Sequence, residues 1–413
     1  MRPTRRDFLR LGLGSATLLA AGKTVPLFLA SSARAAEARA FGGRVLVVLE
    51  LSGGNDGLNT VVPYRDDDYR KHRPRLRVER NAVLRIDDQV GLHPALGGLA
   101  RLLEARGLAI VQGVGYPNPS RSHFQSLAIW HSAREDPTGA TQGWLNRCLG
   151  QRTGAAGGDP PALHVSDAEL PLALSGRELH VPSLTRVEQV RRRLGLPDGP
   201  AAKNQRAALD QVSAEPRGAP GSHLQFIQRS ALVTYASSAR LEEILRAGHD
   251  AASYPPTGLG RRLALTAQLI KAGLTISIYY TQLDGFDTHV NQVGTHPGLL
   301  REFGDALWAF FDDLNRAGQG ERVLTLAFSE FGRRVAENAS GGTDHGTVGP
   351  VFLAGPGVRV GLHNRHPDLR NLEDHDPKYV VDFRRVYAAV LDRWLGCPSE
   401  QVLGAQFEPL PIL

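Results

Sequence analysis

Residues 323–358 read VLTLAFSEFGRRVAENASGGTDHGTVGPVFLAGPGV, an apolar run that is followed at once by charged and imidazole side chains. The run 323–328 has the length and composition of a buried strand. The polar side chains that come after it are Ser329, Glu330, Arg333, Asp344 and His345. Open α/β sheets place their ligand sites beyond the carboxyl ends of strands, and unpaired charges are costly to bury. The stretch therefore predicts a functional site at a strand end.

Two further clusters follow apolar runs in the same way. LSGGNDGLN at 51–59 comes after the run 44–50, and LDGFDTHVNQVGTH at 283–296 comes after the run 274–281. Because parallel strands end at one edge of a sheet, we expect the three clusters to form one shared site.

Apolar strands alternate with amphipathic helices along the chain. The helix expected at Leu299–Leu314 shows the pattern most clearly, since its leucines and phenylalanines recur at steps of three and four residues. The other expected helices are Pro94–Arg106, Leu259–Ala272 and Phe383–Leu395, and the expected strands are Arg44–Leu51, Leu108–Val114, Leu274–Thr281, Val323–Phe328 and Val351–Ala354. This order predicts an α/β fold, with a doubly wound, mostly parallel sheet that carries helices on both faces.

The N-terminus has the pattern of a bacterial twin-arginine export signal. The pair Arg5-Arg6 precedes Phe8-Leu9 and a short apolar region, and Ala33-Arg34-Ala35 is a small-residue cleavage site. The apolar region is interrupted by Lys23 and is too short to span a bilayer, although an uncleaved membrane anchor is the alternative. We expect the twin-arginine export machinery to deliver the protein to the periplasm or the medium, with the signal 1–35 cleaved after Ala35 and no membrane span left.

The mature chain, residues 36–413, is expected to form a single domain. Between residues 150 and 221 the periodicity weakens while Gly, Pro, Ala and Arg accumulate, which indicates a cap or an irregular insertion.

Most of the positive charge lies in the leader. The whole chain has a net charge of +6, and the leader accounts for +5 of it, from Arg2, Arg5, Arg6, Arg10, Lys23 and Arg34 against Asp7. The mature protein is left with +1 and has no basic stripe interleaved with aromatic residues. This composition argues against nucleic acid as a partner.

The chain has two cysteines, Cys148 and Cys397, both in expected helices. They could form one disulfide in an oxidising compartment, but such a pair is no disulfide framework and no metal site. Two buried thiols are the favoured interpretation.

The glycine-rich loop after the first strand carries Asp56. Glycines let the backbone turn sharply there and would hold the Asp56 carboxylate near a ligand. A plain turn accounts for Asn-Asp-Gly equally well, because Asn and Asp bond their own backbone.

Ser122 opens the helix that follows the second strand. It could act as a nucleophile activated by a neighbouring base or metal ion. Alternatively, Ser122 and Gln125 could form an S-x-x-Q capping box that satisfies backbone donors.

The loop 283–296 combines carboxylates and imidazoles, namely Asp284, Asp287, His289 and His296. With Asp344 and His345 these groups suit a divalent ion such as zinc, manganese, magnesium or iron. The cluster contains no cysteine thiolate, which would favour a softer metal. Glu330 and Arg333 could belong to the same site. The alternative is that they form an i, i+3 ion pair on a helical turn capped by Ser329.

Five segments together resemble a large family of twin-arginine-exported bacterial proteins, a domain of unknown function placed in the alkaline phosphatase superfamily. They are VVLELSGGNDGLNTVVPY, YPNPSRSHFQSLAIW, GFDTHVNQ, SEFGRRVAENASGGTDHGT and DFRRVYAAVLDRWLG. The resemblance implies a doubly wound sheet with a two-metal site, and a Ser or Thr nucleophile that attacks a phosphate or sulfate ester. It places Ser122 at the nucleophile, Asp56 after the first strand, and Asp287 with His289 at the first metal, where Asp284 is the competing acid.

The Asp-His-Gly motif of the superfamily can be aligned in two ways. Asp344-His345-Gly346 matches it in sequence, whereas Glu330-Phe331-Gly332 holds the place directly after a strand. The second alignment is favoured because its motif follows a strand, as in the superfamily. In this alignment Phe331 replaces the histidine, and because Phe cannot coordinate a metal, the second metal site loses a ligand. Pro117 replaces the Cys or Ser that the formylglycine sulfatase signature needs before Pro119-Ser120-Arg121.

The sequence thus predicts an exported, metal-dependent hydrolase or transferase that acts on a small or polymeric phosphate or related ester. Its expected metal ligands are drawn from Asp56, Asp287, His289, Glu330, Asp344 and His345. Ser122 is the expected nucleophile, and Arg333 or Arg121 is expected to stabilise the oxyanion. The alternative is a non-catalytic envelope protein, for binding or assembly, that keeps the fold; Phe331 motivates it.

Overall fold

A central eight-stranded sheet organises the computed structural model, which describes residues 40–151, 160–176, 181–184 and 254–413. In spatial order its strands are β10 (Gly361–His363), β5 (Leu108–Gly115), β9 (Gly349–Ala354), β8 (Val323–Phe328), β1 (Val45–Ser52), β7 (Ile278–Asp284) and β6 (Ala162–His164), and β13 (Val381–Asp382) also pairs with β5. All pairings are parallel except those of β9, which is antiparallel to β5 and β8. The predicted α/β fold with a mostly parallel sheet is confirmed.

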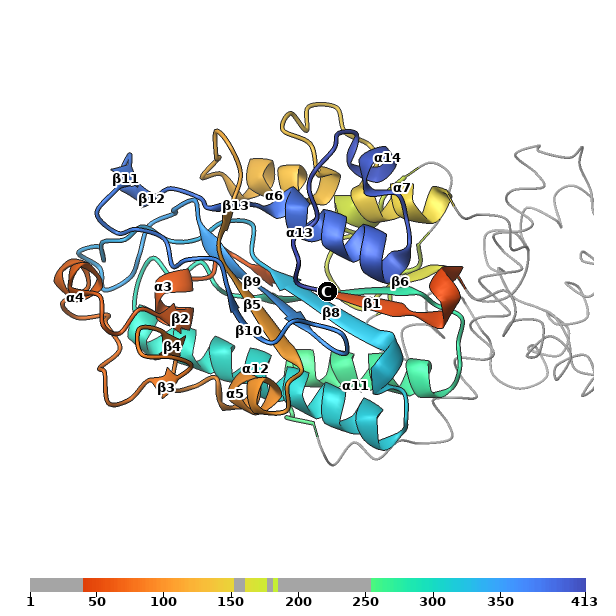
Figure 1. The fold of residues 1–413 in the computed structure, drawn as a ribbon, viewed down its shortest axis with the longest axis horizontal. Helices are drawn as coiled ribbons and strands as arrows, with labels where there is room; N and C mark the ends of the chain where they lie inside the picture. The colour runs from red at the N-terminus through yellow and green to blue at the C-terminus, as the bar shows by residue number, and fades with distance from the viewer. Residues whose placement is uncertain (1–39, 152–159, 177–180, 185–253) are drawn as a thin grey trace, which may run out of the picture.

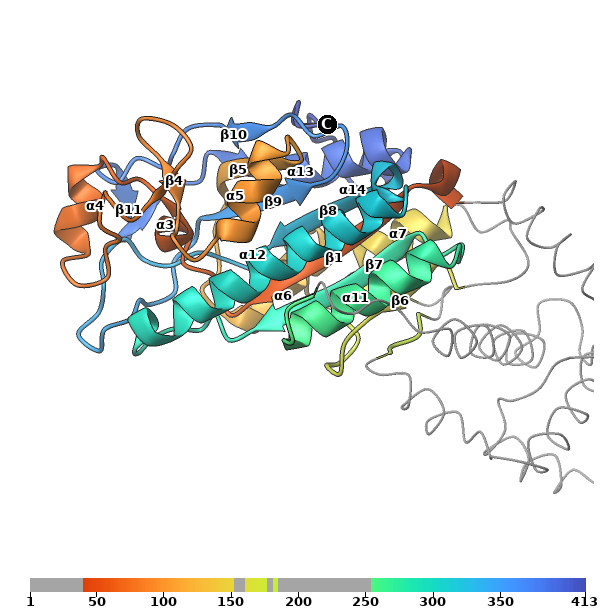
Figure 2. The same ribbon diagram turned by 90° about the horizontal axis from the view of Figure 1, so that it is seen from below.

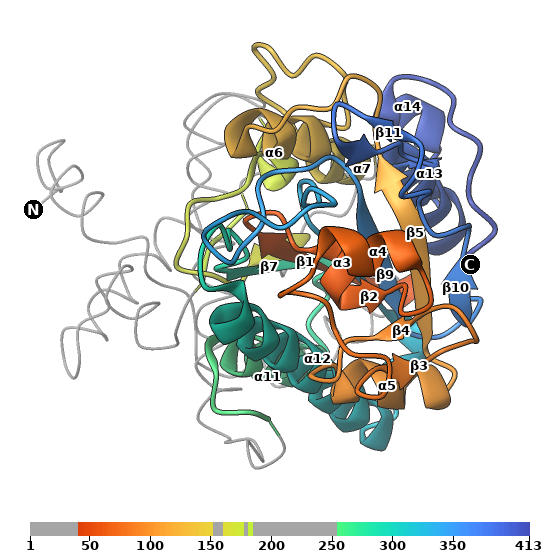
Figure 3. The same ribbon diagram turned by 90° about the vertical axis from the view of Figure 1, so that its left-hand side faces the viewer.

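Helices cover both faces of the sheet (Figures 1 and 3). One layer contains α6 (His123–Ser132), α7 (Trp144–Gly150), α13 (Phe383–Ala389) and α14 (Ser399–Leu403). The other contains α5 (Gly97–Glu104), α11 (Gly258–Lys271) and α12 (Gln292–Arg316), and Figure 2 shows α11 and α12 lying along the sheet.

The alternation of side chains along each strand explains this double cover. In β1, Leu46 and Val48 pack into the core on one face, while Val45, Val47 and Leu49 pack into the core on the other. Successive side chains of a strand point to opposite faces, so a strand that is apolar throughout must be covered twice. The helix α12 contributes the stripe predicted from its periodicity, with Phe303, Leu307 and Phe310 fully buried.

The expected elements differ from the observed ones mainly at their ends. The helix α12 begins at Gln292, seven residues before the expected start, and includes Pro297. The strand β7 begins at Ile278 rather than Leu274. The expected last helix continues beyond α13 as the π-helical turn η5 (Val390–Leu395) and ends at Gly396, whose φ of 62° suits glycine.

Part of the weakly periodic segment 150–221 belongs to the main sheet. Residues 160–176 and 181–184 supply the edge strand β6 and the short 3₁₀ helix η2 (Leu172–Leu174). The rest of that segment and the signal 1–35 lie outside the described residues, so the predictions of a cap and of export remain predictions.

Smaller elements gather at the carboxyl end of the parallel strands, which is the left side of Figure 1. They include the sheet of β2 (Val61–Val62), β4 (Gly91–Leu92) and β3 (Leu84–Arg85), the helices α3 (Gly57–Thr60) and α4 (Asp67–His72), and the hairpin of β11 (Leu372–Glu373) and β12 (Asp376–Pro377). Two more 3₁₀ turns, η1 (Ala40–Gly43) and η4 (Gly320–Arg322), precede β1 and β8.

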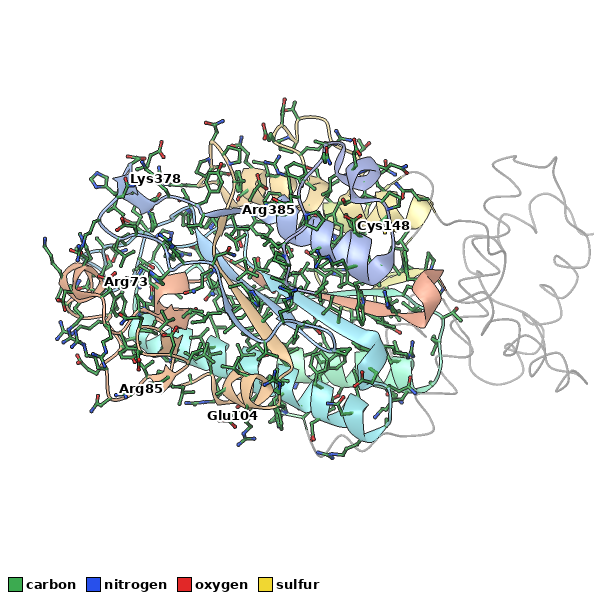
Figure 4. The ribbon with its side chains drawn as sticks, in the orientation of Figure 1. Arg73, Arg85, Glu104, Cys148, Lys378 and Arg385 are labelled. Carbon is green, nitrogen blue, oxygen red and sulfur yellow. The ribbon has the colours of Figure 1, made fainter. Side chains whose placement is uncertain are left out.

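Cys148 and Cys397 are both buried, as expected, and the Cys397 Sγ atom lies 3.6 Å from the Cys148 carbonyl oxygen. Cys148 lies in the layer of α7, far from Arg73 at the carboxyl end of the strands (Figure 4). Within the described part of the chain, no helix is long and apolar enough to cross a membrane.

Candidate metal centre

Four side chains from three loops converge at the carboxyl edge of the sheet. His123 opens α6 after β5, Asp287 and His289 follow β7, and His345 lies between β8 and β9. The Nε2 atoms of His289 and His345 are 2.8 Å apart, and they lie 3.1 Å and 3.0 Å from Asp287 Oδ1. His123 Nε2 lies 3.5 Å from the other carboxylate oxygen, Asp287 Oδ2. Donor atoms of His123, Asp287 and His345 all lie within 4.8 Å of one another.

The second nitrogen of each imidazole contacts an acceptor. His123 Nδ1 lies 2.7 Å from Glu330 Oε1, and His289 Nδ1 lies 3.2 Å from Asp344 Oδ1. His345 Nδ1 lies 2.7 Å from the Arg121 carbonyl oxygen. Carboxylates and carbonyls only accept hydrogen bonds, so with a cation bound each Nδ1 would keep its hydrogen for these acceptors and each Nε2 would offer its lone pair to the cation.

This arrangement fits a metal ion. The donor atoms of His123, Asp287 and His345 lie close enough together to share one cation, and His289 Nε2 adjoins two of these residues. In addition, His123 Nε2 is buried without a hydrogen-bond partner among the described residues. Imidazoles whose other nitrogen is held by a carboxylate or carbonyl are typical of metal ligands. Three nitrogens and one oxygen suit zinc or another first-row transition ion better than magnesium, which prefers oxygen ligands.

Arg333 holds the Asp287 carboxylate in place. Its side chain is fully buried, and Nη2 donates to Asp287 Oδ1 at 2.6 Å. Nε donates to the Gly54 carbonyl at 2.6 Å and Nη1 to the Thr343 carbonyl at 2.8 Å. Although burial alone would raise the pKa of Asp287, the hydrogen bonds from Arg333 and His345 lower it to about 2. The carboxylate is therefore ionised at neutral pH.

Glu330 holds the His123 ring in place through its contact with Nδ1. The Glu330 side chain is fully buried, and its Oε1 atom also accepts a hydrogen bond from the Gly53 backbone N–H at 2.9 Å. The residues after β8 form no helix; instead an isolated antiparallel bridge pairs Arg333 with His345. The alternative of an i, i+3 ion pair on a helical turn is therefore wrong.

The loop after β1 passes very close to the centre. Gly54 has a φ of 76°, and a Cβ atom there would lie 2.3 Å from the Phe331 ring. Glycine is needed at this position for both the left-handed backbone and the close approach. The Phe331 ring in turn lies with its centroid 4.8 Å from those of His123 and His345. Phe331 therefore packs directly against two of the converging imidazoles.

Asp56 does not join the four converging side chains. It forms a buried ion pair with Arg73, and it also accepts hydrogen bonds from Gln292 Nε2 and the Asn59 backbone N–H. Burial would raise the pKa of Asp56, but the charge of Arg73 lowers it. Both carboxylate oxygens of Asp56 are thus bonded to protein donors.

The competing acid Asp284 also lies apart from the centre. It is exposed at the end of β7 and accepts a hydrogen bond from Gln282 at 3.1 Å. Of the two acids in this loop, it is Asp287 that meets the imidazoles. The other histidine of the loop, His296, is buried in α12 with its Nε2 atom 2.9 Å from Asn55 Oδ1.

Ser122 is exposed, and its side chain makes no capping hydrogen bond to α6. Gln125 Oε1 instead accepts from Ser120 Oγ at 3.0 Å, so the predicted capping box is not formed. Ser122 lies between two residues that touch the centre, since the Arg121 carbonyl holds His345 and the His123 ring is part of it. The Arg121 guanidinium is engaged by Asp374 and Asp376.

The chain matches the family described as "Protein of unknown function (DUF1501)" over residues 105–392, well over half of its length. The chain belongs to the DUF1501 family. No curated protein matches it.

Among solved structures, this DUF1501 chain is similar to a sulfatase, PsFucS1, from Pseudoalteromonas sp., at 10% identity and a TM-score of 0.40, with 95% of this chain and 75% of that chain covered. A protein in the alkaline phosphatase superfamily from Vibrio parahaemolyticus matches at 9% identity and a TM-score of 0.34, covering 89% and 72%. The C-terminal periplasmic domain of EcEptC from Escherichia coli, in complex with zinc, matches at 10% identity and a TM-score of 0.31, covering 76% and 73%.

The sequence analysis of this DUF1501 chain missed His123. Its signal was present, because His123 follows the strand β5 just as the other ligand candidates follow β7 and β8. Of the adjacent residues Ser122 and His123, only Ser122 was predicted to act in the site. The same analysis treated Glu330 and Asp344 as ligands, whereas both contact the Nδ1 side of an imidazole.

Proposed function

We propose that this protein is a metal-dependent hydrolase or transferase that acts on a phosphate or related ester. The observation that carries the proposal is the convergence of three imidazole Nε2 atoms on the Asp287 carboxylate. His123, Asp287, His289 and His345 would hold one divalent transition-metal ion, with zinc the best match to this donor set. When bound, the metal would supply a Lewis acid that polarises the ester.

Ser122 would be the nucleophile. Its exposed hydroxyl makes no hydrogen bond to a described residue, and its two neighbours in sequence both touch the centre. The Ser122 oxygen would lose its proton and bond to the phosphorus or sulfur of the ester as the bond to the alcohol oxygen breaks, and the alcohol would leave with a proton. Water in a hydrolase, or another hydroxyl in a transferase, would then take the group from Ser122 and restore its hydroxyl.

Arg334 would attract the negative charge of the substrate. Arg333 is consumed by Asp287 and backbone carbonyls, and Arg121 by Asp374 and Asp376. Arg334 is partly exposed, and its guanidinium makes no ion pair with a described residue. The Arg334 backbone N–H donates to the Asp344 carbonyl at 3.0 Å, and the Asp344 side chain contacts His289 Nδ1, so Arg334 lies beside the loop that carries His345.

The proposal is tested by elemental analysis together with ester assays. Purified protein is expected to contain about one zinc-like ion per chain, and His345→Ala is expected to lose it. Wild type and Ser122→Ala are then compared on p-nitrophenyl phosphate, bis(p-nitrophenyl) phosphate and p-nitrophenyl sulfate. Turnover that requires both the metal and Ser122 supports the proposal, while equal activity in Ser122→Ala removes the nucleophile.

A second function is favoured by one observation, the position of Phe331. Its buried ring packs against His123 and His345, where a two-metal enzyme would need a further ligand. The second candidate is therefore an envelope protein that binds a metal or a partner without turnover. It predicts a metal-loaded, folded protein with no activity on any ester, and turnover that depends on Ser122 would exclude it.

We also propose export to the periplasm through the twin-arginine pathway, on the basis of the N-terminal sequence. Fractionation of cells that express the full chain tests this directly. Changing Arg5 and Arg6 to Lys is expected to retain the protein in the cytoplasm.

A further inference from the structure

The loop that carries Arg121 is tied to the hairpin β11–β12. Arg121 Nε and Nη2 donate to Asp376 Oδ2 at 2.9 Å and 2.6 Å, and Nη1 donates to Asp374 Oδ2 at 2.6 Å. Nη2 also donates to the Asp374 carbonyl at 3.2 Å. A planar guanidinium that bonds several oxygens at once is held in one orientation, and its own backbone is held with it.

The backbone of Arg121 is the part that reaches the metal centre. Its carbonyl oxygen accepts the hydrogen bond from His345 Nδ1 at 2.7 Å. That bond sets which way the His345 ring faces. A shift of this carbonyl would turn the His345 Nε2 lone pair away from Asp287.

Burying the Asp376 carboxylate at this position costs free energy. Its side chain is 2% exposed, and the Oδ1 atom is buried without a hydrogen-bond partner among the described residues. A buried carboxylate oxygen that is left unbonded lowers the stability of the fold. Burial accordingly raises the pKa of Asp376, although the hydrogen bond and charge of Arg121 oppose this. Asp374, which bonds the same guanidinium, has a side chain that is 65% exposed.

We infer that Asp376 is a positioning residue of the candidate metal centre, which fixes the Arg121 backbone and through it the orientation of the His345 ring. The inference rests on the centre described in the proposed function, but it does not depend on catalysis or on the substrate. A network of this kind explains why a costly buried carboxylate is present 31 residues beyond His345, in a hairpin that contributes no ligand of its own.

The matched pair Asp376→Asn and Asp374→Asn tests this inference. Both substitutions remove one charge next to Arg121, but only Asp376→Asn turns a buried carboxylate into a neutral amide, whose oxygen accepts the two guanidinium hydrogen bonds more weakly. The affinity for zinc is expected to fall about tenfold in Asp376→Asn, as is typical when a group that orients a ligand is lost. In Asp374→Asn the affinity is expected to stay within about twofold of wild type.

A second measurement keeps the inference independent of the proposed function. In metal-free protein, the imidazole ¹⁵N signals of His345 are expected to coincide in wild type and Asp374→Asn and to shift in Asp376→Asn, with those of His289 unchanged. Absence of zinc binding in wild type would overturn the proposed function, while the NMR result would still decide this inference. Unchanged His345 imidazole signals in folded Asp376→Asn would overturn it. If that variant does not fold, Arg121→Gln tests the same link, with the same shift expected at His345.

Discussion

The Nε2 atoms of His289 and His345 lie 2.8 Å apart although 56 residues separate them in sequence. The other nitrogen of each ring contacts an acceptor, Asp344 for His289 and the Arg121 carbonyl for His345. Two lone pairs at this distance need a cation between them, or a proton on one ring. The first prediction follows from this contact.

Zinc is expected to stabilise the folded protein. A ligand that binds only the folded state adds about 2.7 kcal/mol at a concentration 100 times its Kd, so Tm should rise with the zinc concentration and fall again with EDTA. Thermal unfolding of wild type and His345→Ala measures the effect, and the variant should show none. If the Tm of wild type does not change with the zinc concentration, the proposed metal centre is contradicted.

Glu330→Gln is expected to weaken zinc binding by about tenfold or more, because Glu330 Oε1 fixes the His123 ring. Glu337→Gln is the matched control, since the Glu337 carboxylate bonds Arg75 and the backbone of Leu76 rather than an imidazole. Zinc titration with a competing chelator gives both affinities. Similar affinities in the two variants would mean that Glu330 does not orient His123.

Asp56→Asn separates a structural role from a ligand role. Removing one partner of a buried ion pair typically costs about 3–5 kcal/mol, here because Arg73 is left as an uncompensated buried charge. The free energy of unfolding in urea should drop by that order, while the zinc affinity of the folded variant should remain that of wild type. A loss of zinc affinity without a loss of stability would instead restore Asp56 as a metal ligand.

Arg334→Gln is expected to weaken the binding of inorganic phosphate to the zinc-loaded protein by about tenfold, since a hydrogen bond to a charged group contributes about 1.5–3 kcal/mol. The amount of bound zinc should not change. Arg370→Gln is the control, because Arg370 is an exposed arginine already paired with Asp68. Calorimetric titration gives the phosphate affinity of both variants. An equal loss of affinity in the two would show that only the overall charge of the protein affects phosphate binding.

Acid should destabilise the fold through His164, away from the metal centre. Burial lowers the pKa of this imidazole to about 4, against about 6.5 in the unfolded chain. Between these values only the unfolded state binds the proton, so the stability is fully present above pH 6.5 and falls as the pH drops toward 4. The loss between pH 7 and pH 5 is about 2 kcal/mol. Urea unfolding in EDTA at both pH values should show a smaller loss in His164→Asn than in wild type.

The sequence by itself determined the layered α/β fold. Strands that are apolar on both faces, such as β1 and β8, cannot be stable unless helices cover them twice. It also placed the polar clusters at strand ends, because β8 contains no charged side chain and β1 contains only Glu50. The antiparallel direction of β9 could not be foreseen, since a short apolar strand reads the same in either direction.

Only the tertiary structure decided which of the clustered residues face one another. Asp56 and Asp287 follow neighbouring strands and look equivalent in sequence, yet Arg73 pairs with the first and leaves the second to the imidazoles. The same holds for Glu330, which contacts the Nδ1 atom of His123 rather than the side that faces the centre. The physical reason is geometric. Periodicity fixes the edge of the sheet at which a side chain emerges, whereas its hydrogen-bond partners depend on loops that come together only when distant strands pair.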